Sequence, residues 1–250
     1  MNKKLFIAAL VLITLAAGMA IAQTPTAAEL LARVDDNEIF DTIYYEAEMI
    51  IERTLRGRLR RDVKNMNVWA RGNTHNFMEF TNRDDRGVRY LMNPSEFVYF
   101  HPDNERPIDV PSHMLVNWMD SDLSFEDVKE NATLSSRYRP LITGTDTVNG
   151  RPAWVLELTA IGIERHPFRR LWIDQGNYDL VKYELLTLSQ TAVQEYKLIR
   201  IDEIGGRRFP VEIEIRDLTR NDSRTVMILR NVQLNIPIAD SVFDVRNLRR

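Results

Sequence analysis

The chain has 250 residues, with 33 lysines and arginines against 36 aspartates and glutamates, and a formal net charge of −3 at pH 7. This mild negative charge argues against a nucleic-acid partner, because such binding depends on neutralising phosphates with basic side chains. The chain contains no cysteine, so disulfides cannot hold it together and a hydrophobic core must do so.

Residues 1–22 have the three-part layout of a secretory signal peptide. Two lysines precede an apolar run from Leu5 to Ala17, and a small-x-small cleavage site ends at Ala22. The run is short for a membrane-spanning helix, which needs about 20 residues. We expect cleavage after Ala22, export to the periplasm, and one soluble domain over residues 23–250, because no cysteine is present to carry an acyl anchor.

The mature chain begins with the spacing of a helix. Leu30, Leu31, Val34 and Phe40 can share one helical face, and Thr26 with Glu29 fits a capping box at its start. The sequence therefore predicts an amphipathic helix that covers something apolar.

From residue 42 the periodicity changes to two, which is typical of strands with one buried face. The first run alternates apolar and polar positions, with Ile43, Tyr45, Ala47 and Met49 on one side. Later runs include AWVLELT, with Trp154, Leu156 and Leu158 on one side, and PVEIEIRD, with Val211, Ile213 and Ile215 on one side. Turn signals separate the runs, and Asn149-Gly150 is the strongest of them, so we expect a meander of antiparallel strands.

The middle of the chain, from Met92 to Pro140, is rich in proline and has few clean alternations. We interpret it as loops and short helices laid across the sheet. The end, IADSVFDVRNL, predicts a short closing turn with Val242, Phe243 and Leu248 directed inward.

An acidic stretch, WMDSDLSFEDVKEN at 118–131, could be a metal loop, a pair of catalytic carboxylates or a helix start. A calcium loop of the EF-hand type would need glycine and glutamate where Phe125 and Asn131 stand. A helix start fits better, because Ser124 can cap the helix and Asp127 can reach back three residues later. Metal binding and catalysis stay open as weaker interpretations.

Other signs of chemistry are missing from the sequence. The four histidines, His75, His101, His113 and His166, form no helical metal pair. There is no nucleophile elbow, phosphate-binding loop or dinucleotide fingerprint. Asp146 and Glu157 could in principle act as acid and base, but in a meander any two acids can be nominated. We therefore expect no catalytic residue, no metal site, no cofactor and no enzyme activity.

Two basic stretches remain. RTLRGRLRRD at 53–62 holds five arginines, and ERHPFRR at 164–170 is a second basic loop. Each could contact anionic lipid head groups or a partner protein, or could be a loop that charge keeps soluble.

The order of several segments resembles the outer membrane lipoprotein-sorting proteins of the LolA/LolB-like superfamily. These segments are SDLSFEDV, TGTDTVNGRPAWVLELTA, LWIDQGNYDLVKYEL, IGGRRFPVEIEIRD and DSVFDVRNL, which with the early helix span most of the mature chain. The resemblance implies a mainly β, α+β fold: a strongly curved antiparallel sheet of about ten or eleven strands, forming an unclosed β-barrel with a helical lid. It places SDLSFEDV at the cap of a lid helix.

The resemblance also implies a function. Carriers of this family hold lipoprotein acyl chains on the concave apolar face and shuttle them toward the outer membrane, without cofactor or covalent chemistry. We expect a monomer that takes lipid or lipoprotein acyl chains, with an inner-membrane transporter and an outer-membrane acceptor as partners. The alternative is a periplasmic accessory or sensor domain that binds an envelope transporter or another partner protein, and a hydrolase with an unrecognised site is a third interpretation. The arginine that gates the lid in well-known carriers has no matching position here.

Large apolar side chains in the alternating runs could either fill the core or line such a cavity. We expect six of them on or near the concave face: Trp69, Phe77, Tyr90, Trp154, Leu156 and Trp172. A register slip of one residue would turn each of them to the other face.

Overall fold

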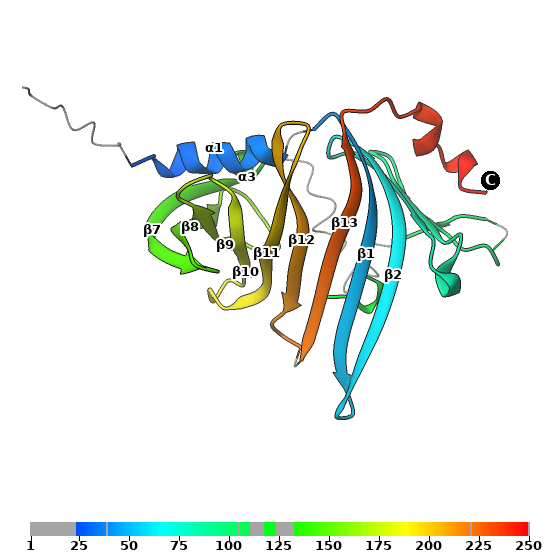
Figure 1. Cartoon of the computed structure of the whole chain (residues 1–250), viewed down its shortest axis with the longest axis horizontal. Helices are drawn as coiled ribbons and strands as arrows, with labels where there is room; N and C mark the ends of the chain where they lie inside the picture. The colour runs from blue at the N-terminus through cyan, green and yellow to red at the C-terminus, as the bar shows by residue number, and fades with distance from the viewer. Residues whose placement is uncertain are drawn as a thin grey trace, which may run out of the picture.

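The computed structural model describes residues 24–38, 40–104, 106–110, 118–123, 133–220 and 222–249. These residues form one strongly curved antiparallel sheet of thirteen strands, in the order β6-β5-β4-β3-β2-β1-β13-β12-β11-β10-β9-β8-β7 (Figure 1). Its first seven strands in chain order are β1 (Thr42–Leu55), β2 (Arg58–Arg71), β3 (His75–Phe80), β4 (Arg89–Met92), β5 (Phe97–Phe100), β6 (Ile108–Asp109) and β7 (Tyr138–Val148). The other six are β8 (Arg151–Ala160), β9 (Phe168–Asp174), β10 (Leu180–Leu186), β11 (Ala192–Ile204), β12 (Arg207–Asp217) and β13 (Ser223–Leu234).

The sheet is an unclosed barrel, as the resemblance to the LolA/LolB-like superfamily implies. Consecutive strands pair with each other, except β6 with β7, and at the centre β1 pairs with β13 and so joins the two halves. The two outer strands, β6 and β7, are the edges. The number of strands exceeds the expected ten or eleven, because the proline-rich middle contributes the short strands β5 and β6.

Helix α1 (Ala27–Glu38) lies across one end of strands β8 to β10 (Figure 1). Its start is the predicted capping box: the Thr26 N–H donates to the Glu29 carboxylate at 2.8 Å, and the Glu29 N–H donates to the Thr26 hydroxyl at 3.2 Å. Leu30, Leu31 and Val34 are buried in one cluster with the concave side of β8 and β9. The helical spacing is therefore confirmed for these three residues, whereas Phe40 lies beyond the end of the helix at Glu38. The apolar face explains where the helix packs.

The predicted alternation is confirmed in the register of the strands. In β1, Tyr45, Ala47 and Met49 share the concave face and pack in one cluster. In β12, Val211 and Ile215 are each 2% exposed, and the neighbouring strands bring their partners to the same side. The β7–β8 hairpin turns at Asn149-Gly150 with φ of 51° and 78°, a left-handed pair that the sequence Asn-Gly favours.

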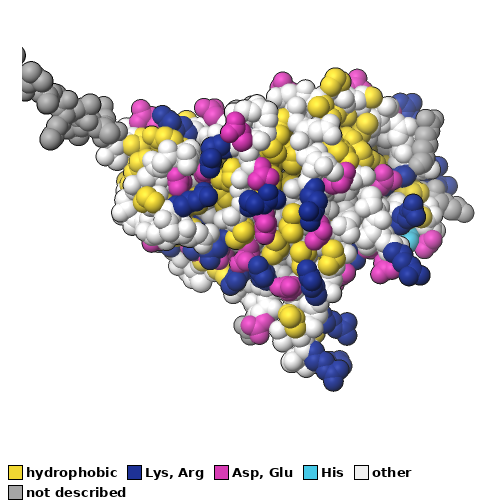
Figure 2. Space-filling view, in the orientation of Figure 1, with side chains coloured by type: hydrophobic (Ala, Val, Ile, Leu, Met, Phe, Trp, Pro, Cys, Tyr) yellow, Lys and Arg dark blue, Asp and Glu magenta, His cyan; other side chains and the backbone are white. Residues whose placement is uncertain are grey.

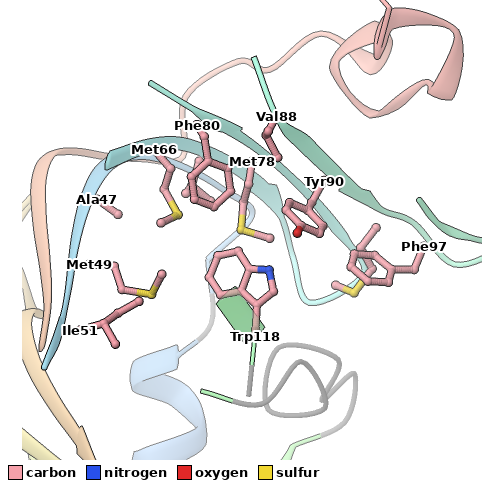
Figure 3. Packing of buried hydrophobic residues seen from close by; sticks show 12 residues of the cluster. Ala47, Met49, Ile51, Met66, Met78, Phe80, Val88, Tyr90, Phe97 and Trp118 are labelled. Carbon is pink, nitrogen blue, oxygen red and sulfur yellow. The ribbon is translucent and has the colours of Figure 1, made fainter. Parts of the chain in front are cut away.

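A second cluster fills the concave side of β1 to β5 (Figure 3). Trp118, from the short helix η3 (Trp118–Asp120), points up into the curve of the sheet. Its ring lies 5.8 Å from Phe80 and 5.7 Å from Tyr90, measured between centroids. Met66 and Met78 pack around it. This cluster and the one under α1 occupy opposite sides of the hollow.

The convex face carries two kinds of cover. Over β3 to β5, the C-terminal helices η4 (Asp240–Phe243) and η5 (Val245–Asn247) bury Phe243 and Leu248 against the sheet, as expected for the closing turn. Elsewhere basic and acidic side chains are intermingled over the strands that face the viewer in Figure 2. Lys182, for example, contacts Glu184 at 2.7 Å and Glu195 at 2.8 Å.

Only the first part of the acidic stretch, residues 118–123, is described by the structure. The predicted helix cap from Ser124 onward lies outside the described residues. Asp122 is 1% exposed. Its carboxylate accepts hydrogen bonds from the hydroxyls of Thr225, at 2.8 Å, and Ser223, and from the Asp217 N–H at 3.3 Å. Its backbone oxygen accepts from Gln194 at 2.5 Å. Asp122 therefore fixes the Trp118 segment to the ends of β11, β12 and β13, which is a structural role.

Candidate functional site

A cavity of about 550 Å³ lies on the concave face, between the cluster under α1 and the Trp118 cluster. Its apolar lining includes Ile43 and Tyr45 from β1, Met66, Val68 and Ala70 from β2, Met78 from β3, Leu171 from β9, Leu198 from β11, Ile213 from β12, and Met227 and Leu229 from β13. Central strands supply most of this wall, because the curve of the sheet separates the α1 cluster on β8 and β9 from the Trp118 cluster on β1 to β5. The volume falls within the range of about 300–1,000 Å³ that is usual for small-molecule pockets.

The end of α1 forms one border of the cavity through Val34, Asn37 and, after the helix, Phe40. Polar contacts hold this end in place. Asp35 accepts hydrogen bonds from the N–H groups of Leu134, at 2.8 Å, and Ser135, at 3.0 Å, at the start of α3 (Leu134–Arg137). These contacts tie α1 to α3.

On the other side, Arg207 of β12 donates to the Asp36 carbonyl at 2.8 Å and so caps the C-terminal end of α1. A cation near a helix C-terminus is favourable because the unpaired carbonyls there are partly negative. The guanidinium of Arg33 also stacks over the Tyr178 ring at 4.0 Å. Helix α1 is thus attached at both flanks, next to the cavity, by contacts that do not belong to the core.

The charged side chains of the lining are paired. Arg208 binds the buried Asp179 carboxylate through two nitrogens, at 3.0 and 2.7 Å. The side chains of Lys182 and Lys197 lie on the opposite, convex face with Glu184 and Glu195, and Lys182 stands over the Trp172 ring there. Because the Arg208 guanidinium already faces a carboxylate, it adds little net charge to the wall. Such a wall suits an apolar ligand better than a highly charged one.

Three tyrosine side chains show that the cavity wall is poorly hydrated. Burial raises the pKa of Tyr45 to about 12, because a phenolate would lose its hydration there. Tyr183 and Tyr196 stack with ring centroids 4.2 Å apart and nearly parallel planes, 12° from each other. Both line the cavity and present flat apolar surface to it. The wall therefore excludes water around its aromatic groups.

Three of the six predicted site residues point away from the hollow, which corrects the expectation. Trp69 and Phe77 pair across β2 and β3, 5.4 Å apart, and pack with the cluster under the C-terminal segment on the convex face. Trp172 follows Leu171 in β9 and so faces the opposite side, where its N–H donates to Asp146 at 2.9 Å. The strands were predicted correctly, but in β2 and β9 the neighbouring residues, Val68 and Leu171, face the cavity in place of Trp69 and Trp172.

The other three lie on the concave side but outside the cavity lining. Tyr90 packs edge-on against Trp118. Trp154 stacks on Tyr178 with centroids 5.5 Å apart, and Leu156 is fully buried beneath α1. They fill the two clusters that border the cavity, and contact with a ligand stays a prediction for them.

The sequence analysis missed the medium-sized residues that form the actual wall. The signal was present, because Tyr45 and Ile213 stand in the cleanest alternating runs of the chain. Weighting by side-chain size directed attention to Trp69, Trp154 and Trp172, which do not border the cavity, whereas Trp118, which does border it, was not among the expected site residues.

Among the residues that the structure describes, no group of three or more histidines, aspartates or glutamates is placed to hold a metal ion. No helix in the same residues has both the length and the apolar character needed to cross a bilayer.

The curved, unclosed sheet with a helix across one end and a cavity on its concave face defines a LolA-like half-barrel. Solved structures share this fold. They include a DUF1329 family protein from Desulfovibrio piger, with a TM-score of 0.75 and 18% identity over 89% of this chain and 97% of that one. A LolA superfamily protein from Nitrosomonas europaea gives a TM-score of 0.70 and 20% identity over 88% of this chain and 98% of the other.

A putative outer membrane lipoprotein-sorting protein domain from Vibrio parahaemolyticus gives a TM-score of 0.74 and 14% identity, over 90% of this chain and 98% of that one. At these identities the likeness shows the fold. A family model described as "Uncharacterized protein" matches residues 72–250, and the chain belongs to that family. The comparison with curated proteins finds no match.

Proposed function

We propose that the chain is a non-catalytic periplasmic carrier that binds the acyl chains of lipids or lipoproteins in the concave cavity and shuttles them toward the outer membrane. One observation carries the proposal: a cavity of about 550 Å³ walled by Met, Val, Leu, Ile and Tyr side chains of the central strands. The similarity to the Vibrio parahaemolyticus protein, a putative outer membrane lipoprotein-sorting protein domain, is consistent with such a role.

The energetics suit a carrier that must also release its cargo. Each buried methylene contributes roughly 0.8 kcal/mol, so ten of them contribute about 8 kcal/mol before ordering costs, which corresponds to roughly micromolar affinity. Because this affinity comes from area rather than from specific bonds, head groups of different kinds can be accepted. The paired charges of the lining add no strong preference.

Helix α1 is the element suited to act as the lid. Its apolar face covers the cluster beside the cavity, and its polar attachments are local: Asp35 binds the start of α3, and Arg207 of β12 binds the Asp36 carbonyl. Moving the helix would replace contacts of Val34 and Phe40 with contacts to lipid. Such an exchange can be near balance, so a carrier of this kind needs no energy source of its own. An inner-membrane transporter and an outer-membrane acceptor would be its partners.

Solvent extraction of the purified chain, followed by mass spectrometry, tests the proposal. We expect acyl lipid or a lipoprotein fragment in near-stoichiometric amount after purification from a periplasmic extract. An empty protein that also fails to take up a fluorescent fatty acid would contradict it. If that empty protein instead captured an envelope transporter, the accessory-domain alternative would hold. Turnover of an ester or glycoside would support the hydrolase.

A further inference from the structure

The hairpin of β1 and β2 extends beyond the rest of the sheet (Figure 1). The last residue pair between β1 and β13 is Arg53 with Ser223, and the Thr54 N–H donates to the Asp222 carbonyl at 3.2 Å. On the other strand, β2 pairs with β3 only from Met66 onward. From Leu55 to Lys64 the two strands pair only with each other within the described chain, through a turn at Arg56-Gly57 with φ of 52° and 73°. The tip of this hairpin therefore stands free of the body.

The tip concentrates positive charge in a chain that is negative overall. Residues 53–62 hold five arginines and one aspartate. Arg53 contacts Asp120 at 3.3 Å and Arg61 approaches Glu52 at 3.8 Å. Among the described residues, no side-chain hydrogen bond or ion pair is found for Arg56, Arg58 and Arg60, all of which are exposed. Figure 2 shows the dark-blue side chains gathered at this projecting end.

Two exposed leucines accompany these arginines. Leu55 is 43% exposed and Leu59 is 70% exposed. Leu59 pairs with Thr54, and Leu55 is the next residue in the strand, so the two leucines lie on opposite faces of the hairpin. A pocket on a partner protein would cover one face of the hairpin. Apolar side chains on both faces instead favour a medium that surrounds the tip.

The second basic stretch is different, although the sequence suggested the same alternatives for both. Its Glu164 is paired with Arg137, and its Arg170 contacts Glu157 at 3.0 Å and Glu184 at 3.5 Å. Arg169 is buried and donates to the Tyr138 hydroxyl at 3.0 Å. The charges of that stretch hold the fold together, whereas those of the hairpin tip are directed to the solvent.

We propose that the β1–β2 hairpin tip docks the protein on an anionic phospholipid bilayer, with the arginines on the head groups and Leu55 and Leu59 in the interfacial layer. Both leucines lie within two residues of the turn, which at about 3.3 Å per residue gives roughly 7 Å of reach. Apolar groups of interfacial segments enter by about 5–10 Å, so the reach is sufficient. The docking is independent of the cavity and stands or falls without the carrier function.

Vesicle co-sedimentation of the purified chain tests the electrostatic part, using phosphatidylcholine vesicles with or without an equal amount of phosphatidylglycerol. The tip variant carries Arg56→Gln, Arg58→Gln and Arg60→Gln. The matched control changes the same net charge elsewhere on the surface, with Arg83→Gln, Arg86→Gln and Arg139→Gln. Each arginine near an anionic surface contributes about fivefold in binding, so the tip variant should bind phosphatidylglycerol vesicles about 100-fold more weakly. The control should bind much as the parent does.

The absence of cysteine allows the insertion to be followed at single sites. An environment-sensitive dye on Leu59→Cys should brighten and shift to the blue when phosphatidylglycerol vesicles are added. The same dye on Thr74→Cys, in the exposed turn at the other end of β2, should not respond.

Three results would overturn the inference. They are no binding of the parent chain to phosphatidylglycerol vesicles, equal losses in the tip variant and the control, or a dye on residue 59 that does not respond. Salt-sensitive binding to an acidic polypeptide without binding to vesicles would assign the tip to a protein partner instead.

Discussion

Filling the cavity from its wall should weaken acyl-chain binding without weakening the fold. Leu229 of β13 pairs with Ala47 and is partly buried, and its side chain borders the cavity. In Leu229→Trp the side chain gains about six non-hydrogen atoms, and the indole occupies space that a ligand would use. The folded state should keep or gain stability, because the added surface is buried in existing empty volume.

The magnitude follows from the methylenes displaced. If the indole excludes about three to six of them, binding loses about 2.5–5 kcal/mol, and the Kd rises by about 60-fold to several thousandfold. Titration with a fluorescent long-chain fatty acid measures the Kd, and urea unfolding measures stability in the same samples. A higher Kd with unchanged or higher stability indicates a blocked cavity. A higher Kd with lower stability indicates a damaged fold.

Leu141→Trp is the matched control for this experiment. Leu141 is on the edge strand β7, is 64% exposed and does not border the cavity. The same substitution there should leave the Kd unchanged. A folded Leu229→Trp protein with the parent's affinity would refute the assignment of this cavity as the binding site.

Three further outcomes follow from the described contacts. Leu156→Ala should lower the free energy of unfolding by about 2–5 kcal/mol, because Leu156 is fully buried. The folded variant should still bind the fatty acid. Unchanged stability with lost binding would instead make Leu156 a ligand-binding residue. Asp122→Ala should cost about 2–4 kcal/mol, since it leaves buried donors unpaired, whereas exposed Asp120→Ala should cost under about 1 kcal/mol; equal costs in thermal melts would contradict the anchor role. A hydrogen bond from Arg137 lowers the pKa of Glu164 below its ordinary value of 4.5. The pair therefore stabilises the fold above that value and less as pH falls through the lowered pKa, so the stability deficit of Glu164→Gln should shrink in acid; a deficit independent of pH would exclude this.

The fold was predictable because several local signals agree. Alternation in β1 and β12, the Asn149-Gly150 turn and the capping box of α1 each specify one local structure, and all are present. Curvature and closure depend instead on long-range pairing, above all of β1 with β13, which no local pattern specifies. The resemblance to a known family supplied that part.

The site was less predictable, and particular residues show why. Trp69 and Val68 are neighbours in β2, and a one-residue difference in phase decides which of them meets the cavity. The convex face is also apolar where the C-terminal helices cover it, so Trp69 and Phe77 satisfy the same pattern as wall residues. Sequence shows that a side of a strand is buried, but it does not show what buries it.

The acidic stretch gives the same lesson in another form. Asp120 and Asp122 are two residues apart, yet one is exposed beside Arg53 and the other is buried among hydroxyl donors from β13. The partners of Asp122 are about 100 residues away in the chain. Spacing alone therefore could not separate a surface acid from a structural anchor.

A crystal structure of the chain with a long-chain fatty acid tests the central claim most directly. The account predicts continuous density for the hydrocarbon tail on the concave face, in contact with Val68 of β2, Leu229 of β13 and Ile213 of β12. Density on the convex face near Trp69, or a cavity that stays empty at saturating fatty acid, would contradict it.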